Sequence, residues 1–251
     1  MSIICCAEVR HMIKMLKERL VITGCAFLVL LVFAAVSPRP ARPAVPARPV
    51  DGETGALQGK IICVDAGHGG ADGGARARDS MVWEREINLQ VAQKLQRALE
   101  ARGAQVIMTR EDEKTYSDQK REDLTRRLDL AEEGEAHMLL SIHMNEYRDR
   151  KESGPQVFYR LGHESSRLLA GTLQSALIEG LNPTKRRSAL AGDYFILSRD
   201  LPSVLIECGF ISNSAEEKCL LDAAYQEELA QSIARGVELY FALTENVLSA
   251  P

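Results

Sequence analysis

This chain of 251 residues has few aromatic side chains, 5% in all, and no long basic tract. Proteins that bind nucleic acid need basic groups to neutralise phosphates, and many use aromatic rings to stack bases. The formal net charge of −4 also argues against that function, so we expect no nucleic-acid partner. No internal repeat occurs, and the chain is therefore not a repeat array.

The six cysteines form neither a metal-binding pattern nor a disulfide framework. No C-x-x-C spacing occurs, which excludes a zinc site built from thiolates. Cys63 and Cys208 lie in apolar, strand-like runs, where isolated cysteines act as small buried hydrophobes. Hydrophobic residues make up 45% and charged residues 26%, enough for one substantial core.

The N-terminal segment has the pattern of a membrane-targeting helix. Residues 1–19 contain several basic side chains, and the run from Leu20 to Val36 is uncharged. As a helix this run would reach about 25 Å, against about 30 Å for the hydrocarbon core. The preceding basic residues predict a cytoplasmic N-terminus and an exported remainder. We expect an uncleaved anchor on the outer face of the cytoplasmic membrane; cleavage of this transmembrane or signal helix would make the protein secreted.

Residues 37–56 are rich in proline, with five prolines between positions 38 and 49. This composition favours an extended spacer that holds a domain away from a membrane and adds nothing to a core. We therefore place the folded domain at residues 57–245 and a short tail at residues 246–251.

Strand-like and helix-like stretches alternate through the folded domain. Strands are predicted at residues 61–65, 105–109, 137–142, 155–159, 194–197 and 203–207. Helices are predicted at residues 86–102, 121–133, 164–179 and 225–243. This alternation predicts a single α/β domain with a mostly parallel or mixed central sheet of about six strands and helices on both faces.

Two local features refine this arrangement. Pro155 cannot donate a hydrogen bond to a central ladder, so the strand 155–159 is expected at an edge of the sheet. Leucine spacing in the helix 164–179 predicts an inward face made of Leu168, Leu169, Leu173 and Leu177.

Three strand-like runs end in residues that can bind a metal or move a proton. His68 lies in the motif D-A-G-H-G-G at 65–70, whose glycines allow a sharp turn. His143 lies in S-I-H-M-N at 141–145, and Glu207 follows the apolar run V-L-I at 204–206. The carboxyl ends of strands in an open α/β sheet face one crevice, so we expect these side chains to converge there.

A catalytic zinc ion takes three protein ligands and leaves one position open for water. His68 and His143 offer two nitrogen ligands, and the third is expected to be a carboxylate. Glu84 and Glu86 both lie at the start of a predicted helix, where the helix dipole favours a negative charge. Spacing alone does not separate these two candidates.

Glu207 follows the most apolar strand of the domain, so its pKa is expected to rise as the carboxylate loses hydration. Beside a metal, such a glutamate suits a general base that accepts a proton from an activated water. Alternatively, Glu207 forms a buried structural ion pair with an arginine such as Arg127. These residues by themselves leave both interpretations open.

Two aspartates flank the first histidine motif. Asp65 is expected beside the metal ligands rather than among them, where a carboxylate can orient an imidazole N–H. Asp72 begins the sequence D-G-G and is interpreted as part of a turn.

Four motifs occur in order along the domain: D-A-G-H-G-G at 65–70, E-R-E-I-N-L at 84–89, S-I-H-M-N at 141–145 and E-C-G-F-I-S-N at 207–213. Together they resemble the zinc-dependent N-acetylmuramoyl-L-alanine amidases of the type 3 family. The similarity covers about residues 59–243. Ala66 departs from the pattern, because many members have proline there, and this change is expected to leave the turn intact.

The resemblance implies a zinc ion held by His68, Glu84 and His143, with Glu207 as the catalytic glutamate. It favours Glu84 over Glu86, because the first residue of the helix motif is the ligand in that family. Glu207→Ala is then expected to abolish turnover without loss of zinc.

The same resemblance implies a peptidoglycan substrate and hydrolysis of the amide between N-acetylmuramic acid and L-alanine. Three further residues are implied near the substrate or behind the metal ligands, namely Asp65, Asn145 and Arg127.

Within the family, the layout is similar to the germination-type amidases of endospore formers, which are small and lack wall-binding repeats. The segments 120–124 and 153–159 are also similar to that subgroup. This implies a role in maturation of the spore cortex, where muramic acid is converted to its δ-lactam. A vegetative amidase that separates daughter cells is the alternative. The short interval between Tyr159 and Tyr194 leaves no room for a long inhibitory insertion, so regulation is expected from timing, location or a partner protein.

A zinc peptidase and a metal-free pseudo-enzyme that binds wall peptides are alternatives of another class. The presence of all four candidate residues argues against the pseudo-enzyme. A carboxypeptidase needs a cation for the terminal carboxylate, and Arg127 and Arg186 are the candidates.

Overall fold

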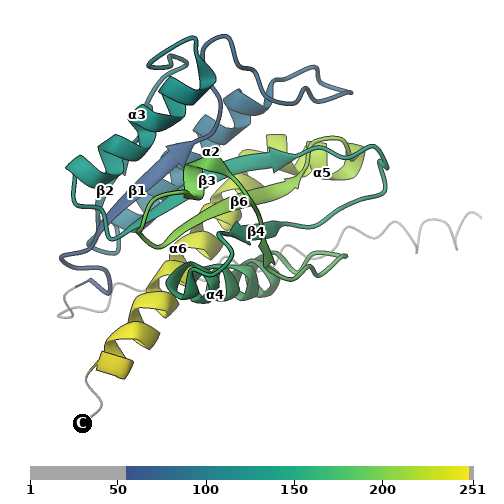
Figure 1. Cartoon of the computed structure of the whole chain (residues 1–251). Coiled ribbons are helices and arrows are strands. Elements are labelled where there is room, and N and C mark those ends of the chain that lie inside the picture. The colour runs from purple at the N-terminus through teal and green to yellow at the C-terminus, as the bar shows by residue number, and fades with distance from the viewer. Residues whose placement is uncertain (1–54, 249–251) are drawn as a thin grey trace, which may run out of the picture. The chain divides into compact units, whose positions relative to one another are not determined.

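A computed structural model describes residues 55–248 of the chain (Figure 1). These residues belong to one compact unit, Gly52–Pro251. The predicted basic segment 1–19, the predicted helix 20–36 and nearly all of the spacer 37–56 lie outside the described residues. Within residues 55–248, no helix combines the length and the apolar character needed to cross a membrane.

A six-stranded mixed sheet forms the centre of the domain, with the spatial order β2-β1-β3-β6-β4-β5. Its strands are β1 (Ile61–Ala66), β2 (Gln105–Met108), β3 (Met138–Asn145), β4 (Gln156–Tyr159), β5 (Leu190–Ala191) and β6 (Ser203–Phe210). β2, β1, β3 and β6 are parallel, whereas β4 runs antiparallel to β6. The predicted α/β class and the mostly parallel sheet are confirmed.

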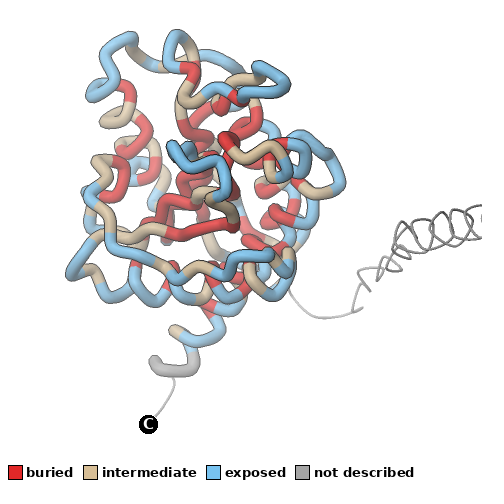
Figure 2. Tube along the Cα trace, turned by 90° about the vertical axis from the view of Figure 1, so that its right-hand side faces the viewer, coloured by how far each residue is buried: buried red, intermediate tan, exposed pale blue. Residues whose placement is uncertain are grey.

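Helices cover both faces of the sheet (Figure 1). They are α2 (Glu84–Glu100), α3 (Lys120–Glu133), α4 (Glu164–Leu181), α5 (Ser214–Leu221) and α6 (Ala223–Leu248). α2, α4 and α6 pack in one large apolar core, and α3 packs against the opposite face. Neighbouring residues such as Cys63 and Val64 belong to different cores because side chains alternate along a strand. Figure 2 shows the buried interior that results.

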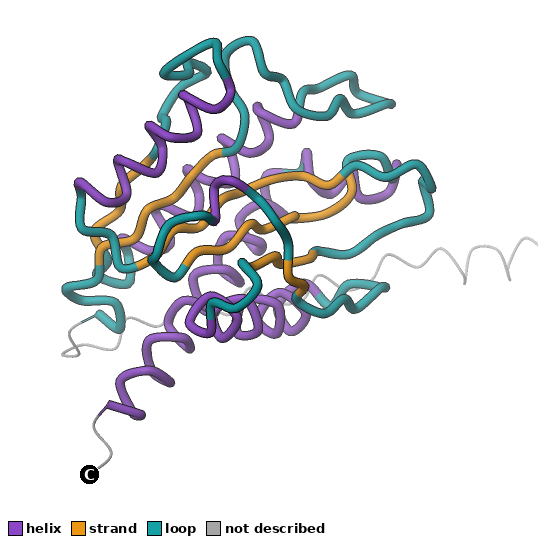
Figure 3. Tube along the Cα trace, in the orientation of Figure 1, coloured by secondary structure: helices purple, strands orange, loops and turns teal. Residues whose placement is uncertain are grey.

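Three local predictions are wrong. Residues 194–197, predicted as a strand, contain the 3₁₀ helix η1 (Phe195–Leu197), and the sixth strand is β5 instead (Figure 3). A short apolar run fits either element, so its pattern alone does not decide. β4 is not at the edge, because β5 pairs with it on the outer side and Pro155 lies just before the strand. Leu168 is 40% exposed, so the buried stripe of α4 is narrower than predicted.

Candidate active site

The carboxyl ends of β1, β3 and β6 meet at one edge of the sheet and carry the side chains of the candidate site. His143 and Glu207 are partners in the register of β3 and β6. Alternation along these strands places both on the face that α3 covers. His68 follows β1 closely, and Glu84 is the first residue of α2. His68, His143 and Glu207 line the same cavity.

One carboxylate oxygen of Glu84 lies between two imidazoles. Its Oε1 is 3.2 Å from Nε2 of His68 and 2.9 Å from Nδ1 of His143. Each of the three side chains offers one ligand atom, and these atoms lie within 4.8 Å of one another. Two imidazoles and a carboxylate form a donor set that zinc accepts while keeping a fourth position open.

Backbone groups also hold Glu84. Its Oε2 accepts a hydrogen bond from the N–H of Ala75 at 2.8 Å, and its Oε1 accepts one from the N–H of Met144 at 3.1 Å. Burial by itself would raise the pKa of Glu84, but hydrogen bonds and charge from the two histidines hold that pKa well below its usual range. The carboxylate is therefore ionised and suited to a cation. Glu86 does not belong to this cluster.

Two glycines leave the space that the ligand-like side chains occupy. A Cβ atom at Gly67 would lie 2.2 Å from Nε2 of His143, and one at Gly74 would lie 2.5 Å from Oε2 of Glu84. Both separations are far below van der Waals contact between non-bonded atoms. Glycine at these positions therefore lets the imidazole and the carboxylate approach each other.

His68 has a backbone φ of 62°, which is uncommon for a residue with a side chain. Its Nδ1 lies 2.9 Å from Oδ2 of Asp72, as an ion pair without the alignment of a hydrogen bond. Burial lowers the pKa of His68, but the carboxylates of Glu84 and Asp72 raise it by more. Asp72 also accepts a hydrogen bond from the N–H of Gly74, so it serves the predicted turn and contacts an imidazole as well.

Asp65 forms no hydrogen bond with either imidazole in the described part of the chain. It is buried on the α3 side of β1 and accepts hydrogen bonds from Thr109 at 2.7 Å, Ser141 at 2.6 Å and Arg127 at 3.0 Å. Arg127 is paired with Asp65 and with a carboxylate one turn earlier in α3. The expectation that Asp65 orients an imidazole is therefore wrong, and so is the alternative ion pair between Arg127 and Glu207.

Glu207 lies beside the cluster with one oxygen that lacks a protein partner. Its Oε2 is shielded from solvent and has no hydrogen-bond partner among residues 55–245. The pKa of Glu207 is raised to about 7. Burial is the largest cause of this increase; the charge of Glu84 adds to it, and His143 partly opposes it. A buried polar atom without a partner indicates that a water or a substrate atom belongs next to it.

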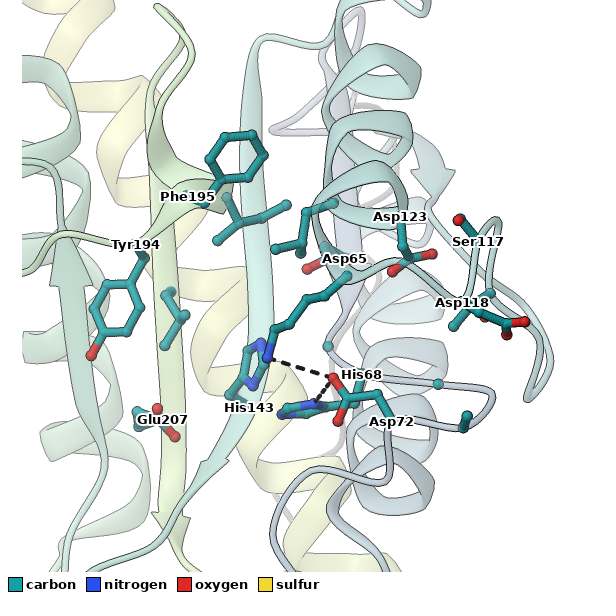
Figure 4. A pocket seen from close by; sticks show the side chains of 18 of the residues that line it. Asp65, His68, Asp72, Ser117, Asp118, Asp123, His143, Tyr194, Phe195 and Glu207 are labelled. Carbon is teal, nitrogen blue, oxygen red and sulfur yellow. Dashed lines mark ion pairs between the residues drawn. The ribbon is translucent and has the colours of Figure 1, made fainter.

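A cavity of about 430 Å³ opens over these residues (Figure 4). One wall comes from the loop before α3, and the other comes from residues 193–196. Figure 4 shows His68 and His143 next to each other, with Glu207 on the neighbouring strand and Tyr194 above it. The apolar part of the lining consists of Leu124, Phe195, Ile196 and Leu205. A cleft of this size and character suits a small organic group.

Glu84, Arg127 and Asn145 are candidates from the sequence that are not among the residues lining the cavity, and other residues that matter were not among the candidates. Asn145 ends β3 after a register shift and does not line the cavity. Tyr194 lines it, but nothing in the local pattern distinguished this tyrosine. Arg110 is buried two residues after the end of β2. A charged residue close behind an apolar strand is the pattern that could have identified Arg110, and the same pattern identifies Glu207.

An α/β domain with a His–Glu–His cluster and a second carboxylate at its strand ends has the parts of a metal-dependent hydrolase. Residues 62–239 match the family Amidase_3, described as N-acetylmuramoyl-L-alanine amidase. The chain belongs to this family, and it is a peptidoglycan amidase of the class that acts between N-acetylmuramic acid and L-alanine.

Similar proteins agree with this assignment. The germination-specific N-acetylmuramoyl-L-alanine amidase of Bacillus subtilis is 38% identical over 194 residues, which cover 74% of this chain and 81% of that protein. The probable cell wall amidase LytH of Staphylococcus aureus is 35% identical over 192 residues, which cover 76% of this chain and 61% of that protein. Among solved structures, the CwlD amidase from Clostridioides difficile, in complex with the GerS lipoprotein, is similar to this chain. The two align with a TM-score of 0.68 and 36% sequence identity, and the alignment covers 73% of this chain and 99% of that one.

Proposed function

We propose that this chain uses zinc to release stem peptides from glycan strands by hydrolysing the amide between N-acetylmuramic acid and L-alanine. The observation that carries the proposal is the shielded Oε2 of Glu207, which has no hydrogen-bond partner among the residues that the structure describes and lies beside the His68–Glu84–His143 cluster. A metal-dependent hydrolase needs a base next to the metal that activates the attacking water, and this arrangement supplies both the base and the ligand set.

His68, Glu84 and His143 would hold the ion, with Nε2 of His68 and Nδ1 of His143 facing the shared carboxylate oxygen. The ionised state of Glu84 fits a cation at this place, and Gly67 leaves room for the imidazole of His143 beside it. Bound zinc supplies Lewis acidity, which polarises a carbonyl and lowers the pKa of a water molecule.

Glu207 accepts the proton of the attacking water and returns it to the nitrogen of L-alanine as the C–N bond breaks. Its pKa of about 7 allows it to accept and release a proton near neutral pH. The products are a carboxylate on the lactyl group and a free amine on the stem peptide. Asp72 holds the ring of His68 from the side opposite Glu84.

The cavity does not favour a carboxypeptidase. Arg127 is 1% exposed, and its donors are taken by Asp65, by a carboxylate of its own helix and by backbone carbonyls. Arg186 is not among the residues that line the cavity. Neither arginine is therefore available to receive a terminal carboxylate.

Digestion of purified peptidoglycan with the full chain, with and without a chelator, tests the reaction. We expect free stem peptides that begin with L-alanine, and we expect none after chelation. Shortened peptides that remain attached to glycan would identify a peptidase and contradict the proposal.

We further propose that the reaction serves maturation of the spore cortex, where it would prepare muramic acid for conversion to the δ-lactam. Similarity to the germination-specific amidase of Bacillus subtilis supports this role. Similarity to the probable cell wall amidase LytH supports a vegetative role as the second candidate. Expression of this chain in a spore former that lacks its own cortex amidase should restore muramic δ-lactam. Restored cell separation without δ-lactam would favour the second candidate.

We propose that residues 20–36 anchor the protein on the outer face of the cytoplasmic membrane, with residues 1–19 inside and residues 37–56 as a spacer. The catalytic domain then follows from residue 57. Its last helix, α6, continues to Leu248 and so includes the start of the predicted tail 246–251. The peptidoglycan substrate lies outside that membrane. Recovery in the membrane fraction with an intact N-terminus is the expected result, and a trimmed protein in the medium would contradict it.

A protein partner is also proposed, because the similar CwlD amidase was solved in complex with the GerS lipoprotein. Affinity purification of the full chain from sporulating cells should recover a partner at constant stoichiometry.

A further inference from the structure

We propose that Arg110 is a positioning residue for the metal site, because its guanidinium holds the backbone turn that presents His68. The inference rests on the zinc site proposed above. Arg110 follows β2 by two residues and is 5% exposed. The proposed reaction assigns it no proton transfer and no contact with substrate.

The guanidinium of Arg110 donates to backbone carbonyls. Nε donates to the carbonyl of Ala66 at 2.8 Å, and Nη2 donates to the carbonyls of Gly67 at 3.0 Å and Arg85 at 2.8 Å. Nη1 donates to the carbonyl of Asp112 at 2.9 Å. Within residues 55–245, no ion pair with a carboxylate accompanies these four bonds.

A second buried arginine acts on the same turn. Nη1 of Arg127 donates to the carbonyl of Ala66 at 2.8 Å, and its Nη2 donates to the carbonyl of His68 at 2.7 Å. Arg110 and Arg127 together therefore bind the carbonyls of three consecutive residues, 66 to 68. We call this pair of guanidinium groups the carbonyl clamp.

Placing two buried like charges against one turn is unfavourable for the fold taken by itself. Burial lowers the pKa of Arg110, and the charge of Arg127 lowers it further. Arg127 is compensated by two carboxylates, whereas Arg110 is held by carbonyl groups. A requirement for a defined backbone geometry at the turn accounts for the burial of this second charge.

The clamp fixes the direction of the His68 side chain. His68 has its φ at 62°, and this conformation directs Nε2 to Oε1 of Glu84 at 3.2 Å. Asn88 donates to the carbonyl of Gly67 at 3.1 Å and to Oε1 of Glu84 at 3.3 Å, so the turn and the carboxylate are linked. Hydrogen bonds on successive carbonyls fix the peptide planes around His68 and thus the position of its imidazole.

A guanidinium suits this task because its donors form a rigid planar fork. A lysine at position 110 would keep the positive charge but could not bridge the carbonyls of Ala66, Gly67 and Arg85 at once. Arg110→Lys therefore separates the geometry of the clamp from its charge, and Arg110→Gln removes both.

The test is the dissociation constant for Zn²⁺ of the full-length protein, measured by competition with a chromophoric chelator, together with the melting temperature of the metal-free form. We expect Arg110→Lys and Arg110→Gln to bind Zn²⁺ about 10- to 100-fold more weakly than the wild type, as loss of groups that orient metal ligands commonly does. Arg102→Lys is the matched control. Arg102 donates to the carbonyl of Ala98 at 2.7 Å and pairs with Glu238 at 3.2 Å, away from the cavity. Its substitution should leave Zn²⁺ affinity within about twofold.

Variants that are less stable but bind Zn²⁺ with wild-type affinity would overturn the clamp and assign Arg110 to the fold alone. Failure of both Arg110 variants to fold, while the Arg102→Lys control folds, would likewise assign Arg110 to the fold alone. A wild-type chain that binds no Zn²⁺ would instead defeat the proposed function, and the clamp with it. Wild-type binding with unchanged affinity in the variants would defeat only the clamp.

Discussion

The carboxylate of Glu207 has one oxygen with no hydrogen-bond partner in the described part of the chain, whereas the carboxylate of Glu84 is bound by two imidazoles and two backbone N–H groups. Burial raises the pKa of Glu207 to about 7, while the histidines hold that of Glu84 well below its usual range. Two glutamates of one site are thus given different protonation behaviour by their surroundings. One is suited to bind a cation and the other to carry a proton.

Glu207→Gln should lower the turnover rate on peptidoglycan by about 10²- to 10⁴-fold, because the amide keeps the shape of the side chain but accepts no proton. Zinc content, measured on the purified protein, should stay at the wild-type level. Glu86→Gln is the matched control and should retain both turnover and zinc. A Glu207→Gln protein with wild-type turnover would rule out the role proposed for this residue.

Asp65 contributes to stability in a pH-dependent way. Burial would raise its pKa, but the Arg127 charge and the hydrogen bonds from Ser141 and Thr109 outweigh this and lower it below 3.8, its ordinary value. Its stabilising contribution is therefore present above pH 3.8 and is lost as the pH falls through the lower pKa of the folded state.

Asp65→Asn should therefore reduce the free energy of unfolding by about 3 kcal/mol at pH 7, because Arg127 is left buried with less compensation. Chemical denaturation should show that the difference from wild type shrinks below the ordinary pKa of 3.8. Asp129→Asn, which disturbs a half-exposed pair with Arg199, should cost less than about 1 kcal/mol. An equal difference at pH 7 and in acid would contradict this account.

At the scale of elements, the site depends on strand ends and on the turn between β1 and α2. β3 and β6 bring His143 and Glu207 into register, and the turn brings His68 and the first residue of α2 to the same edge. The turn can do this because glycines leave room for side chains from other elements. Gly67 shows this most clearly, since its missing Cβ would overlap the imidazole of His143.

Gly67→Ala should displace that imidazole and weaken Zn²⁺ binding by at least about tenfold, because the new Cβ would lie 2.2 Å from Nε2 of His143. Gly171→Ala on α4 is the control. No atom of the described residues would lie within 4 Å of the new Cβ, so this change should stabilise the helix by up to about 1 kcal/mol and leave Zn²⁺ affinity unchanged. Calorimetric titration and thermal melting measure the two effects. Equal affinities in both variants would contradict the role given to Gly67.

At the scale of the whole domain, the cavity lies at the rim of the sheet and the apolar cores lie between sheet and helices. The larger core joins α2, α4 and α6 to the central strands and includes none of the ligand-like side chains. The fold therefore has its main stabilising contacts apart from the metal site.

Removal of metal with a chelator should abolish turnover and leave the far-UV circular dichroism spectrum unchanged. The melting temperature should fall, because a ligand at 100 times its dissociation constant stabilises the folded state by about 2.7 kcal/mol. Added Zn²⁺ should restore both activity and melting temperature. Unfolding on chelation would show instead that the fold depends on the ion.

The elements that the sequence predicted well are those with a long periodic pattern. β1, α3 and α4 begin where expected, because each has an uninterrupted apolar repeat. The pattern was insufficient at residues 194–197, where a three-residue apolar run forms η1, and at β5, which has only two residues. Such short elements are decided by neighbours that are distant in the sequence.

Some residues of the candidate site could also be predicted from the sequence, and others could not. His68, His143 and Glu207 could be selected because each follows an apolar run in the sequence, and the carboxyl ends of parallel strands share an edge whatever the details of packing. The contact of Asp72 with His68 and the hydrogen bonds of Arg110 could not be predicted from the sequence, since both depend on the conformation of the turn at 66–74. Asp65 was misjudged because its side chain lies toward α3, and sequence spacing does not specify a helix–strand contact.

The sequence by itself determined the α/β class, the long strands and helices, and the residue types able to bind a metal, because all of these follow from local periodicity and side-chain chemistry. Only the tertiary structure decided which carboxylate oxygen lies between the two imidazoles, which one has no partner among residues 55–245, and which arginines hold the turn. Those outcomes depend on distances between segments up to about 140 residues apart in the chain, and such distances are set by packing of the whole domain.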